Sequence, residues 1–177
     1  KISKIEFGHE TSWDDSLPQR INGWDPYGGI YSGEVNLEIY WTDTEEKAAR
    51  IAKALSQTDY FYLSSNRQVG SIGRLPKVFP VANLFYQRLL GCSAREYLPA
   101  CYAQSKVGER FGDLGFELIQ IFESYPSLFG VEFNTQLADE SFQVYDHPKV
   151  LLFRNEKRLS AAELQKKLSP ARIVKSN

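Results

Sequence analysis

The stretch that decides the predicted fold is residues 35–63, VNLEIYWTDTEEKAARIAKALSQTDYFYL. Apolar and polar side chains alternate over residues 35–41, a pattern typical of a half-buried strand. Thr42 and Glu45 form a capping-box pattern that predicts the start of a helix. Its apolar stripe, at helical spacing, consists of Ala48, Ile51, Ala52 and Leu55. Residues 60–63 are densely apolar, as buried parallel strands are. Together they predict a strand–helix–strand unit with a right-handed crossover.

Further elements extend this unit on both sides. We expect strands at residues 2–8, 116–122 and 150–153, helices beginning at Pro80 and over residues 161–168, and polar loops over residues 13–33 and 64–76. Residues 142–145 and 150–153 flank a turn and are predicted to form a C-terminal hairpin. Together, these strands and helices predict an α/β fold. We expect a Rossmann-like sandwich around a mixed, mostly parallel sheet that ends in this hairpin.

Composition excludes several classes of protein. The chain has 177 residues, enough for one domain with its own core. Hydrophobic residues make up 42% and the formal charge is −1, so neither disorder nor electrostatic binding to nucleic acid is expected. Residues 70–73, Gly-Ser-Ile-Gly, lack the third glycine of a dinucleotide-binding loop. We expect no cofactor.

The ends of the sequence suggest a piece of a larger protein. The chain begins at Lys1 and contains no methionine, whereas a complete translation product begins with one. No uninterrupted aliphatic and aromatic stretch is longer than the one at residues 150–153, which is far shorter than the roughly 20 residues of a membrane span. We therefore interpret residues 1–177 as a single domain excised from a longer chain.

Two cysteines and two histidines limit the metal chemistry. Cys92 and Cys101 are separated by eight residues, which is not a zinc-ligand spacing. A zinc site would need both of them together with His9 and His147, so we expect no metal. In an oxidising compartment Cys92 and Cys101 can form a disulfide that closes a short loop. The sequence supports two unpaired thiols equally well.

An aromatic residue beside two carboxylates follows the first predicted strand. Trp13, Asp14 and Asp15 suit saccharide recognition, because a sugar ring stacks on an indole while carboxylates accept its hydroxyl protons. Glycosidases also use a pair of carboxylates as their catalytic residues. The structural alternative is that an aspartate caps a turn and Trp13 packs as a lid on the core.

A second polar segment follows the strand at residues 60–63. Ligands of open α/β sheets bind outside the carboxyl ends of the strands, where Ser65, Asn66 and Arg67 are expected. Arg67 and Arg74 can bind phosphate or carboxylate through their planar guanidinium groups. In the alternative, these arginines pair with the aspartates of the first loop and pin two loops together.

Asp146 and His147 complete the predicted ligand-binding residues. They lie next to each other on the turn before residue 150. A catalytic triad with Ser64 or Ser65 is disfavoured, because neighbouring side chains on a turn point apart.

Several phrases occur together in an order that resembles a known family. They are WDDSLP at 13–18, DY at 59–60, SSNR at 64–67, GSI at 70–72, RLP at 74–76, LGFEL at 114–118, SYP at 124–126 and YDHPKV at 145–150. This order resembles the C-terminal extracytoplasmic region of the archaeal and chloroflexal "YYY" polytopic membrane proteins. Those proteins are similar to family 39 (protein mannosyltransferase-like) glycosyltransferases. The resemblance covers residues 13–154, and residues 90–113 depart from it as an insertion.

The resemblance implies a parent protein with a bundle of membrane helices. This domain would then lie on the extracytoplasmic side of the membrane. In glycosyltransferases of that design the donor is a lipid-phosphate-linked sugar, and the catalytic acid lies in a loop between membrane helices, outside this chain. The implied function is that of a non-catalytic domain that helps to recognise acceptor or sugar. The partners are then the membrane helices of the parent chain and a saccharide or lipid-linked sugar.

Two alternatives come from the residues themselves. One is a free-standing carbohydrate-active hydrolase that uses Asp14 or Asp15 together with a distant glutamate. The other is an interaction or scaffold module, which would present an exposed apolar patch in place of a ligand pocket.

Overall fold

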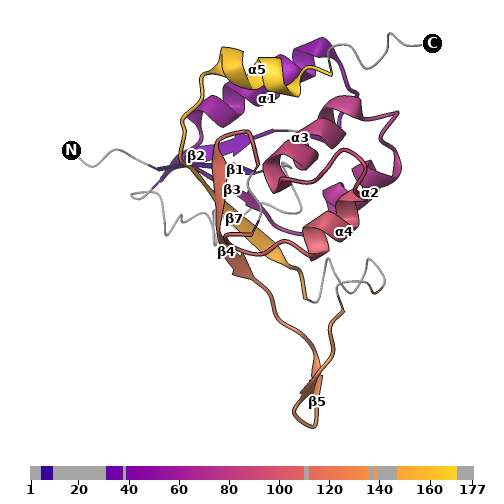
Figure 1. Cartoon of the computed structure of the whole chain (residues 1–177). Coiled ribbons are helices and arrows are strands. Elements are labelled where there is room, and N and C mark those ends of the chain that lie inside the picture. The colour runs from indigo at the N-terminus through magenta and orange to yellow at the C-terminus, as the bar shows by residue number, and fades with distance from the viewer. Residues whose placement is uncertain are drawn as a thin grey trace, which may run out of the picture.

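The computed structural model describes residues 5–9, 31–37, 39–109, 112–135, 138 and 147–170. Its elements are β1 (Ile5–His9), β2 (Tyr31–Asn36), α1 (Glu45–Gln57), β3 (Tyr60–Leu63), α2 (Arg67–Arg74), α3 (Pro80–Leu90), α4 (Leu98–Ala103), β4 (Phe116–Phe122), β5 (Ser127–Leu128), β6 (Val131–Glu132), β7 (Val150–Asn155) and α5 (Ala161–Leu168). Figure 1 shows the helices gathered on one side of a sheet, from which an arm that carries β5 and β6 projects.

The five-stranded sheet has the order β2-β1-β3-β7-β4. β1 pairs in parallel with β2 and β3, while β7 lies between β3 and β4 and is antiparallel to both. The α/β character holds, but the mostly parallel, Rossmann-like sheet predicted from the sequence is wrong. The predicted C-terminal hairpin is wrong as well, because β3 and β4 occupy both edges of β7; residues 142–145 lie outside the described residues.

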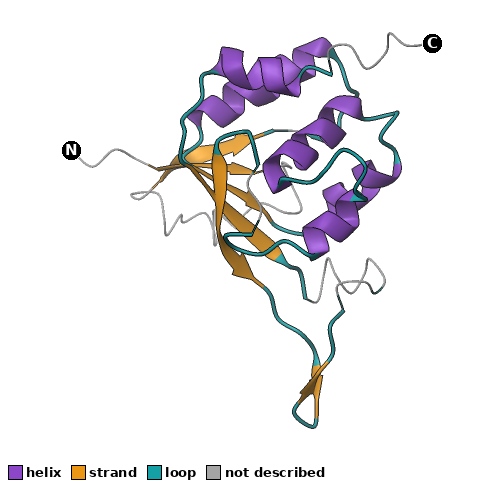
Figure 2. Cartoon of the chain, viewed as in Figure 1, coloured by secondary structure: helices purple, strands orange, loops and turns teal. Residues whose placement is uncertain are grey.

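All five helices cover the same face of the sheet, so the described part of the chain forms two layers (Figure 2). On that face Phe61 of β3 meets Phe85 of α3 edge-on, with ring centroids 5.7 Å apart, and Phe116 of β4 at 6.4 Å. Asn155 of β7 faces the same way and donates to the Thr58 carbonyl, at the end of α1, over 2.8 Å. On the opposite face of β7, Arg154 is 48% exposed. A Rossmann-like fold carries helices on both faces, which is a second departure from the prediction.

Of the predicted strand–helix–strand unit, α1 and β3 are present, but the first strand is misplaced. β2 covers residues 31–36 and not 35–41, and β1 lies between β2 and β3 in the sheet. The helix begins later than predicted. Thr44 is the N-cap, and its hydroxyl accepts a hydrogen bond from the Lys47 amide over 3.1 Å, so the predicted Thr42–Glu45 capping box is wrong. Asp43, which lies between Thr42 and Thr44, instead binds the N-terminus of α3.

Asp43 joins α1 to α3. One of its carboxylate oxygens accepts hydrogen bonds from the amides of Val81 and Ala82, in the first turn of α3, while the other binds Lys47 Nζ. Lys47 Nζ also donates to the Trp41 carbonyl. The Asp43 and Lys47 side chains are only 4% and 2% exposed, and desolvation lowers the Lys47 pKa although the Asp43 carboxylate opposes that shift. The N-cap residue of α3, Phe79, makes no side-chain hydrogen bond to the helix. The carboxylate of Asp43, 36 positions before Phe79, caps the N-terminus of α3 instead.

The segment predicted as a polar loop, residues 64–76, contains the helix α2. The loop prediction was wrong because α2 contains two glycines, and glycine in a helix interior lowers the stability of the helix. At Gly73 the reason for glycine is contact: a Cβ atom there would lie 2.9 Å from the Pro99 ring and 3.0 Å from Leu98 Cβ, both in α4. At Gly70 a Cβ atom would meet no atom of the described residues within 4 Å.

The two remaining helix predictions are confirmed. α3 begins with Pro80 in its first turn and ends at Gly91, which has a positive φ of 70°. α5 has the capping box that its sequence predicted: the Ser160 hydroxyl accepts from the Glu163 amide, and the Glu163 carboxylate accepts from the Ser160 amide. None of the helices in the described part of the chain has the length and apolar character that a bilayer span requires.

Candidate functional site

Four of the predicted site residues, Trp13, Asp14, Asp15 and Asp146, lie outside the described residues. The other five are described. Ser65 and Asn66 lie between β3 and α2, Arg67 and Arg74 are the first and last residues of α2, and His147 precedes β7. The described site residues therefore lie in the β3–α2 loop, in α2 and in the segment before β7.

Strand register brings these two segments to the same edge of the sheet. Leu63, the last residue of β3, pairs with Leu151 of β7, and Phe122, the last residue of β4, pairs with Val150. The chain leaves β3 and β4 at the edge where it enters β7. We call this group of residues the carboxyl edge: Ser64, Ser65, Asn66, Arg67, Glu123, Ser124 and His147.

The β3–α2 loop forms the first half of the carboxyl edge. Ser65 is 2% exposed, and its hydroxyl accepts a hydrogen bond from the Arg67 amide over 3.4 Å. The Asn66 carbonyl accepts from the Gly70 amide over 2.6 Å and so starts α2. Two neighbouring side-chain oxygens, Ser64 Oγ and Gln68 Oε1, are buried without a hydrogen-bond partner among the described residues. Buried polar atoms of this kind are places where water or a polar ligand restores a hydrogen bond.

The second half comes from the segments that flank β4 and β7. Ser124 Oγ lies 3.2 Å from His147 Nδ1, a contact between segments 23 positions apart. The Tyr125 hydroxyl donates to Glu123 Oε2 over 3.0 Å. Partial burial, and then this hydrogen bond, raise the pKa of Tyr125. These groups place hydrogen-bond donors and acceptors close together, and such groups can bind hydroxyl-rich or charged ligands.

Lys149 anchors this half to the helices. It is 5% exposed, and its ammonium group donates to the Ala103 and Ser105 carbonyls at the end of α4, over 2.9 and 3.0 Å. Glu123 lies 3.5 Å from the same ammonium group. Burial lowers the pKa of Lys149, with Glu123 acting in the opposite direction. We interpret Lys149 as a structural residue that fixes the start of β7 and holds Glu123 at the edge.

Sequence reasoning missed Glu123, Ser124 and the contact between Ser124 and His147. The available signal was the phrase SYP at residues 124–126, which entered the family resemblance but was not assigned to the site. The predicted pair of arginines is not brought together. Arg67 and Arg74 begin and end α2, so their backbones lie about 10 Å apart along the helix axis.

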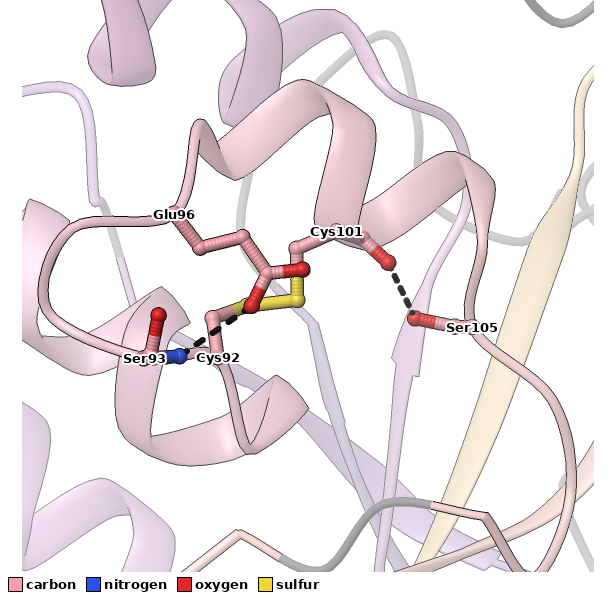
Figure 3. The surroundings of a disulfide bond; sticks show 5 residues. All are labelled: Cys92, Ser93, Glu96, Cys101 and Ser105. Carbon is pink, nitrogen blue, oxygen red and sulfur yellow. Dashed lines mark hydrogen bonds between the residues drawn. A yellow bond between two sulfur atoms is a disulfide. The ribbon is translucent and has the colours of Figure 1, made fainter.

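Cys92 and Cys101 form a disulfide bond. Their Cα atoms are 6.1 Å apart, within the range that a disulfide spans. It joins the residue after the C-cap of α3 to the buried face of α4 (Figure 3). Around it the Glu96 carboxylate accepts from the Ser93 amide over 3.2 Å, and the Ser105 hydroxyl donates to the Cys101 carbonyl over 2.9 Å. Of the two alternatives left open by the sequence, the structure has the bonded one.

A cavity of about 320 Å³ lies beside this disulfide, away from the carboxyl edge. Its lining consists of Leu84, Gln87, Arg88, Gly91, Cys92, Ala94 and Asp113. Arg88 and Asp113 form an ion pair there, and Lys167 approaches Asp113 to 3.3 Å. The Arg88 Nε atom is buried without a hydrogen-bond partner among the described residues, although the guanidinium pairs with Asp113 through Nη1.

Within the described ranges, no group of three or more His, Cys, Asp or Glu side chains is arranged to hold a metal ion. Comparisons with protein-family models, with curated proteins and with solved structures find no match to this chain. The resemblance to the "YYY" membrane proteins, and the function that it implies, therefore stay predictions.

Proposed function

We propose that this chain is a non-catalytic, extracytoplasmic recognition domain of a membrane glycosyltransferase-like protein. Its carboxyl edge holds the saccharide, or the acceptor that receives it, while the parent's membrane helices carry the catalytic groups. The observation that carries the proposal is the register of β3, β7 and β4, which gathers Asn66, Arg67, Ser124 and His147 at one edge.

The chemistry of these side chains supports a saccharide as the ligand. Asn66 offers both a donor and an acceptor, Arg67 offers five N–H donors, and Glu123 offers acceptors. Sugar hydroxyl groups donate and accept, so they need this mixture. Ser64 Oγ at the same edge is buried and has no hydrogen-bond partner in the part of the chain that the structure describes, so it is one more group that a ligand or water can satisfy.

The disulfide supports the extracytoplasmic location. Disulfides persist in oxidising compartments, whereas cytosolic thiols are kept reduced. Cys101 is fully buried and Cys92 packs against the core, so this bond is built into the fold.

A binding assay with matched variants tests the proposal. The probes are methyl α-mannoside, methyl α-glucoside and mannose 1-phosphate, titrated calorimetrically into the whole chain. Arg67→Gln is expected to weaken binding at least tenfold. Arg74→Gln, at the far end of the same helix, is the control and is expected to change the affinity less than twofold.

Three results would overturn the proposal. The first is the absence of binding to any of these probes. The second is equal loss of affinity in both variants. The third is turnover: hydrolysis or transfer of a glycosyl group by the purified chain would contradict its non-catalytic role. Urea denaturation of Arg67→Gln is the check on folding, since a structural role would lower its midpoint without a specific effect on binding.

An interaction module is the second candidate, because one feature favours it directly. Large apolar side chains are exposed on the arm between β4 and β7, where Phe129 is 98% exposed. The two candidates use different parts of the molecule, the carboxyl edge and the arm.

A further inference from the structure

The arm is a β-hairpin with a two-residue turn. Ser127 pairs with Glu132 and Leu128 with Val131, which leaves Phe129 and Gly130 as the central residues of the turn. Both have positive φ, 51° and 82°, as a type I′ turn requires. The hairpin continues one step further, because the Phe133 amide donates to the Pro126 carbonyl over 3.0 Å.

Phe129 is not explained by the turn itself. The first central position of a type I′ turn favours asparagine, aspartate or glycine, because a residue with a bulky side chain rarely adopts a positive φ. Phe129 nevertheless occupies it and is almost wholly exposed. A large apolar side chain held at a strained position and in contact with little of its own chain indicates a role in binding.

The two faces of the hairpin differ in polarity. Side chains alternate along each strand, so Leu128 and Val131 share a face with Pro126 and Phe133, while Ser127 and Glu132 occupy the other. Leu128, Val131 and Phe133 are each at least half exposed. The tip and one whole face are therefore apolar. A lone two-stranded hairpin is marginally stable in water, so this face gains stability when it is covered.

Charge indicates which surface covers it. Residues 123–135 contain Glu123 and Glu132 but no lysine, arginine or histidine. An anionic bilayer repels such a segment, since peripheral helices that bind anionic lipid are rich in lysine and arginine. A zwitterionic bilayer presents outward-facing ammonium groups, which complement the Glu132 carboxylate of the hairpin, whereas Glu123 pairs with Lys149. Glu132 lies two positions beyond the turn, so it can remain among the headgroups while Leu128, Phe129 and Val131 enter the acyl boundary.

Shape and size point the same way. The hairpin tip is the part of the arm farthest from the sheet and helices (Figure 1), so it reaches a flat surface before the body does. Its apolar surface comes from five side chains, whereas a stable protein interface uses some 20–30 residues on each side. A second copy of the chain would therefore be held weakly. A weak insertion suffices for a domain that is already tethered to a membrane, because tethering raises the effective concentration of lipid.

We propose that the tip of the β5–β6 hairpin, with Phe129 at its end, inserts into the headgroup–acyl interface of a zwitterionic membrane. The insertion would orient the carboxyl edge relative to the bilayer. This inference rests on the proposed function in one respect, the tether that makes weak insertion effective.

Site-specific fluorescence tests the insertion. Because Cys92 and Cys101 are bonded, Phe129→Cys introduces the only free thiol, which can be labelled with the environment-sensitive dye NBD. Phosphatidylcholine vesicles are expected to raise the emission of the label at least threefold and to shift it to the blue. The control is Gln165→Cys, at an exposed position of α5, whose emission should stay unchanged.

Co-sedimentation of the unlabelled chain with the same vesicles provides a second readout. Phe129→Asp is expected to reduce the bound fraction at least fivefold. The control is Trp41→Asp, another exposed aromatic residue, 67% accessible but on the body of the domain, which should bind as the wild type does. Both side chains are exposed, so both variants should fold.

The outcomes separate this inference from the proposed function. No emission change with any vesicle, binding only when phosphatidylserine is added, or concentration-dependent self-association lost in Phe129→Asp would each overturn the insertion. Saccharide binding at the carboxyl edge is measured independently on Phe129→Asp. If saccharide binding persists while the wild type does not bind vesicles, only the insertion fails; if the wild type binds vesicles but neither protein binds saccharide, only the proposed function fails.

Discussion

Asp43 performs two tasks at once: it caps α3 and neutralises the buried Lys47. Asp43→Ala leaves the ammonium group without its carboxylate at a site 2% exposed, and removing one partner of a buried pair costs about 3–5 kcal/mol. We expect the free energy of unfolding, measured with urea, to fall by that amount. Glu46→Ala, an exposed neighbour in α1, is the control and should change it by less than about 0.5 kcal/mol.

The double variant Asp43→Ala with Lys47→Met sharpens this prediction. Removing both charges leaves no unpaired ion, so the double variant should be more stable than Asp43→Ala alone. If the double variant is less stable than Asp43→Ala, the ion pair is not the reason for the loss.

Lys149 gives stability a pH dependence with a defined sign. Burial places its folded pKa below 10.5, so between the lowered value and 10.5 the unfolded chain binds more protons than the folded one. The free energy of unfolding then rises with pH over that window. Lys149→Met removes the group, so the stability of wild type relative to this variant should increase from pH 7 to pH 10. Urea denaturation at pH 7, 9 and 10 measures it, and a constant difference would refute it.

Residue-level roles were only partly predictable from the sequence. The Ser160–Glu163 capping box is local in sequence and was found. The role of Asp43 was missed because its partner amides are 38 and 39 positions away, and a pattern search sees Thr42 and Glu45 first. The contact between Ser124 and His147 was missed for the same reason, since only strand register brings these residues together.

At the scale of elements, the segment after residue 111 is tied closely to the end of α3. The Asp113 amide donates to the Arg88 carbonyl over 3.0 Å. A Cβ atom on Gly112 would lie 2.1 Å from that carbonyl oxygen, where it cannot fit. Gly112→Ala should therefore lower the free energy of unfolding by more than about 2 kcal/mol, in the range of overpacking.

Gly70→Ala is the matched control. Gly70 lies inside α2, and a Cβ atom there would have no neighbour within 4 Å in the ranges that the structure describes. Replacing it should leave stability unchanged or raise it by up to about 1 kcal/mol, because alanine favours the helix. Thermal denaturation of both variants tests the pair, and equal melting temperatures would contradict this account of Gly112.

The disulfide fixes α4 against the end of α3. Cys92 and Cys101 are nine positions apart, and closing a loop of this size is worth about 2.5 kcal/mol in the chain-entropy view. The Cys92→Ser, Cys101→Ser double variant should lose about that much, measured by urea denaturation. Addition of a reductant should reproduce the loss in the wild type and leave the double variant unaffected; unchanged stability in both would contradict it.

Helices and strands were predicted well where their signal is local. Residues 116–122, Pro80 at a helix start and residues 161–168 are confirmed as elements. The helix α2 was missed because two glycines outweighed its apolar spacing. The reason for Gly73, the close approach of α4, is a tertiary contact that the sequence does not display.

At the scale of the whole molecule, strand direction is what the sequence failed to predict. The apolar run at residues 60–63 suggested a parallel neighbour on each side, yet β7 pairs with it in the antiparallel sense. The composition of a strand records its burial, not the direction of its neighbours. Candidate ligand-binding residues were nevertheless expected at the carboxyl end of β3, because that expectation depends only on the position of β3 itself.

We propose that this domain recognises its ligand at the carboxyl edge. The most direct test is a titration of the ¹⁵N-labelled chain with methyl α-mannoside and mannose 1-phosphate, followed in amide correlation spectra. We predict that the shifted amides cluster at Ser64, Ser65, Asn66, Arg67, Ser124 and His147. Shifts confined to the cavity beside the disulfide, at Leu84, Arg88 and Ala94, or no shifts at saturating probe, would contradict the claim.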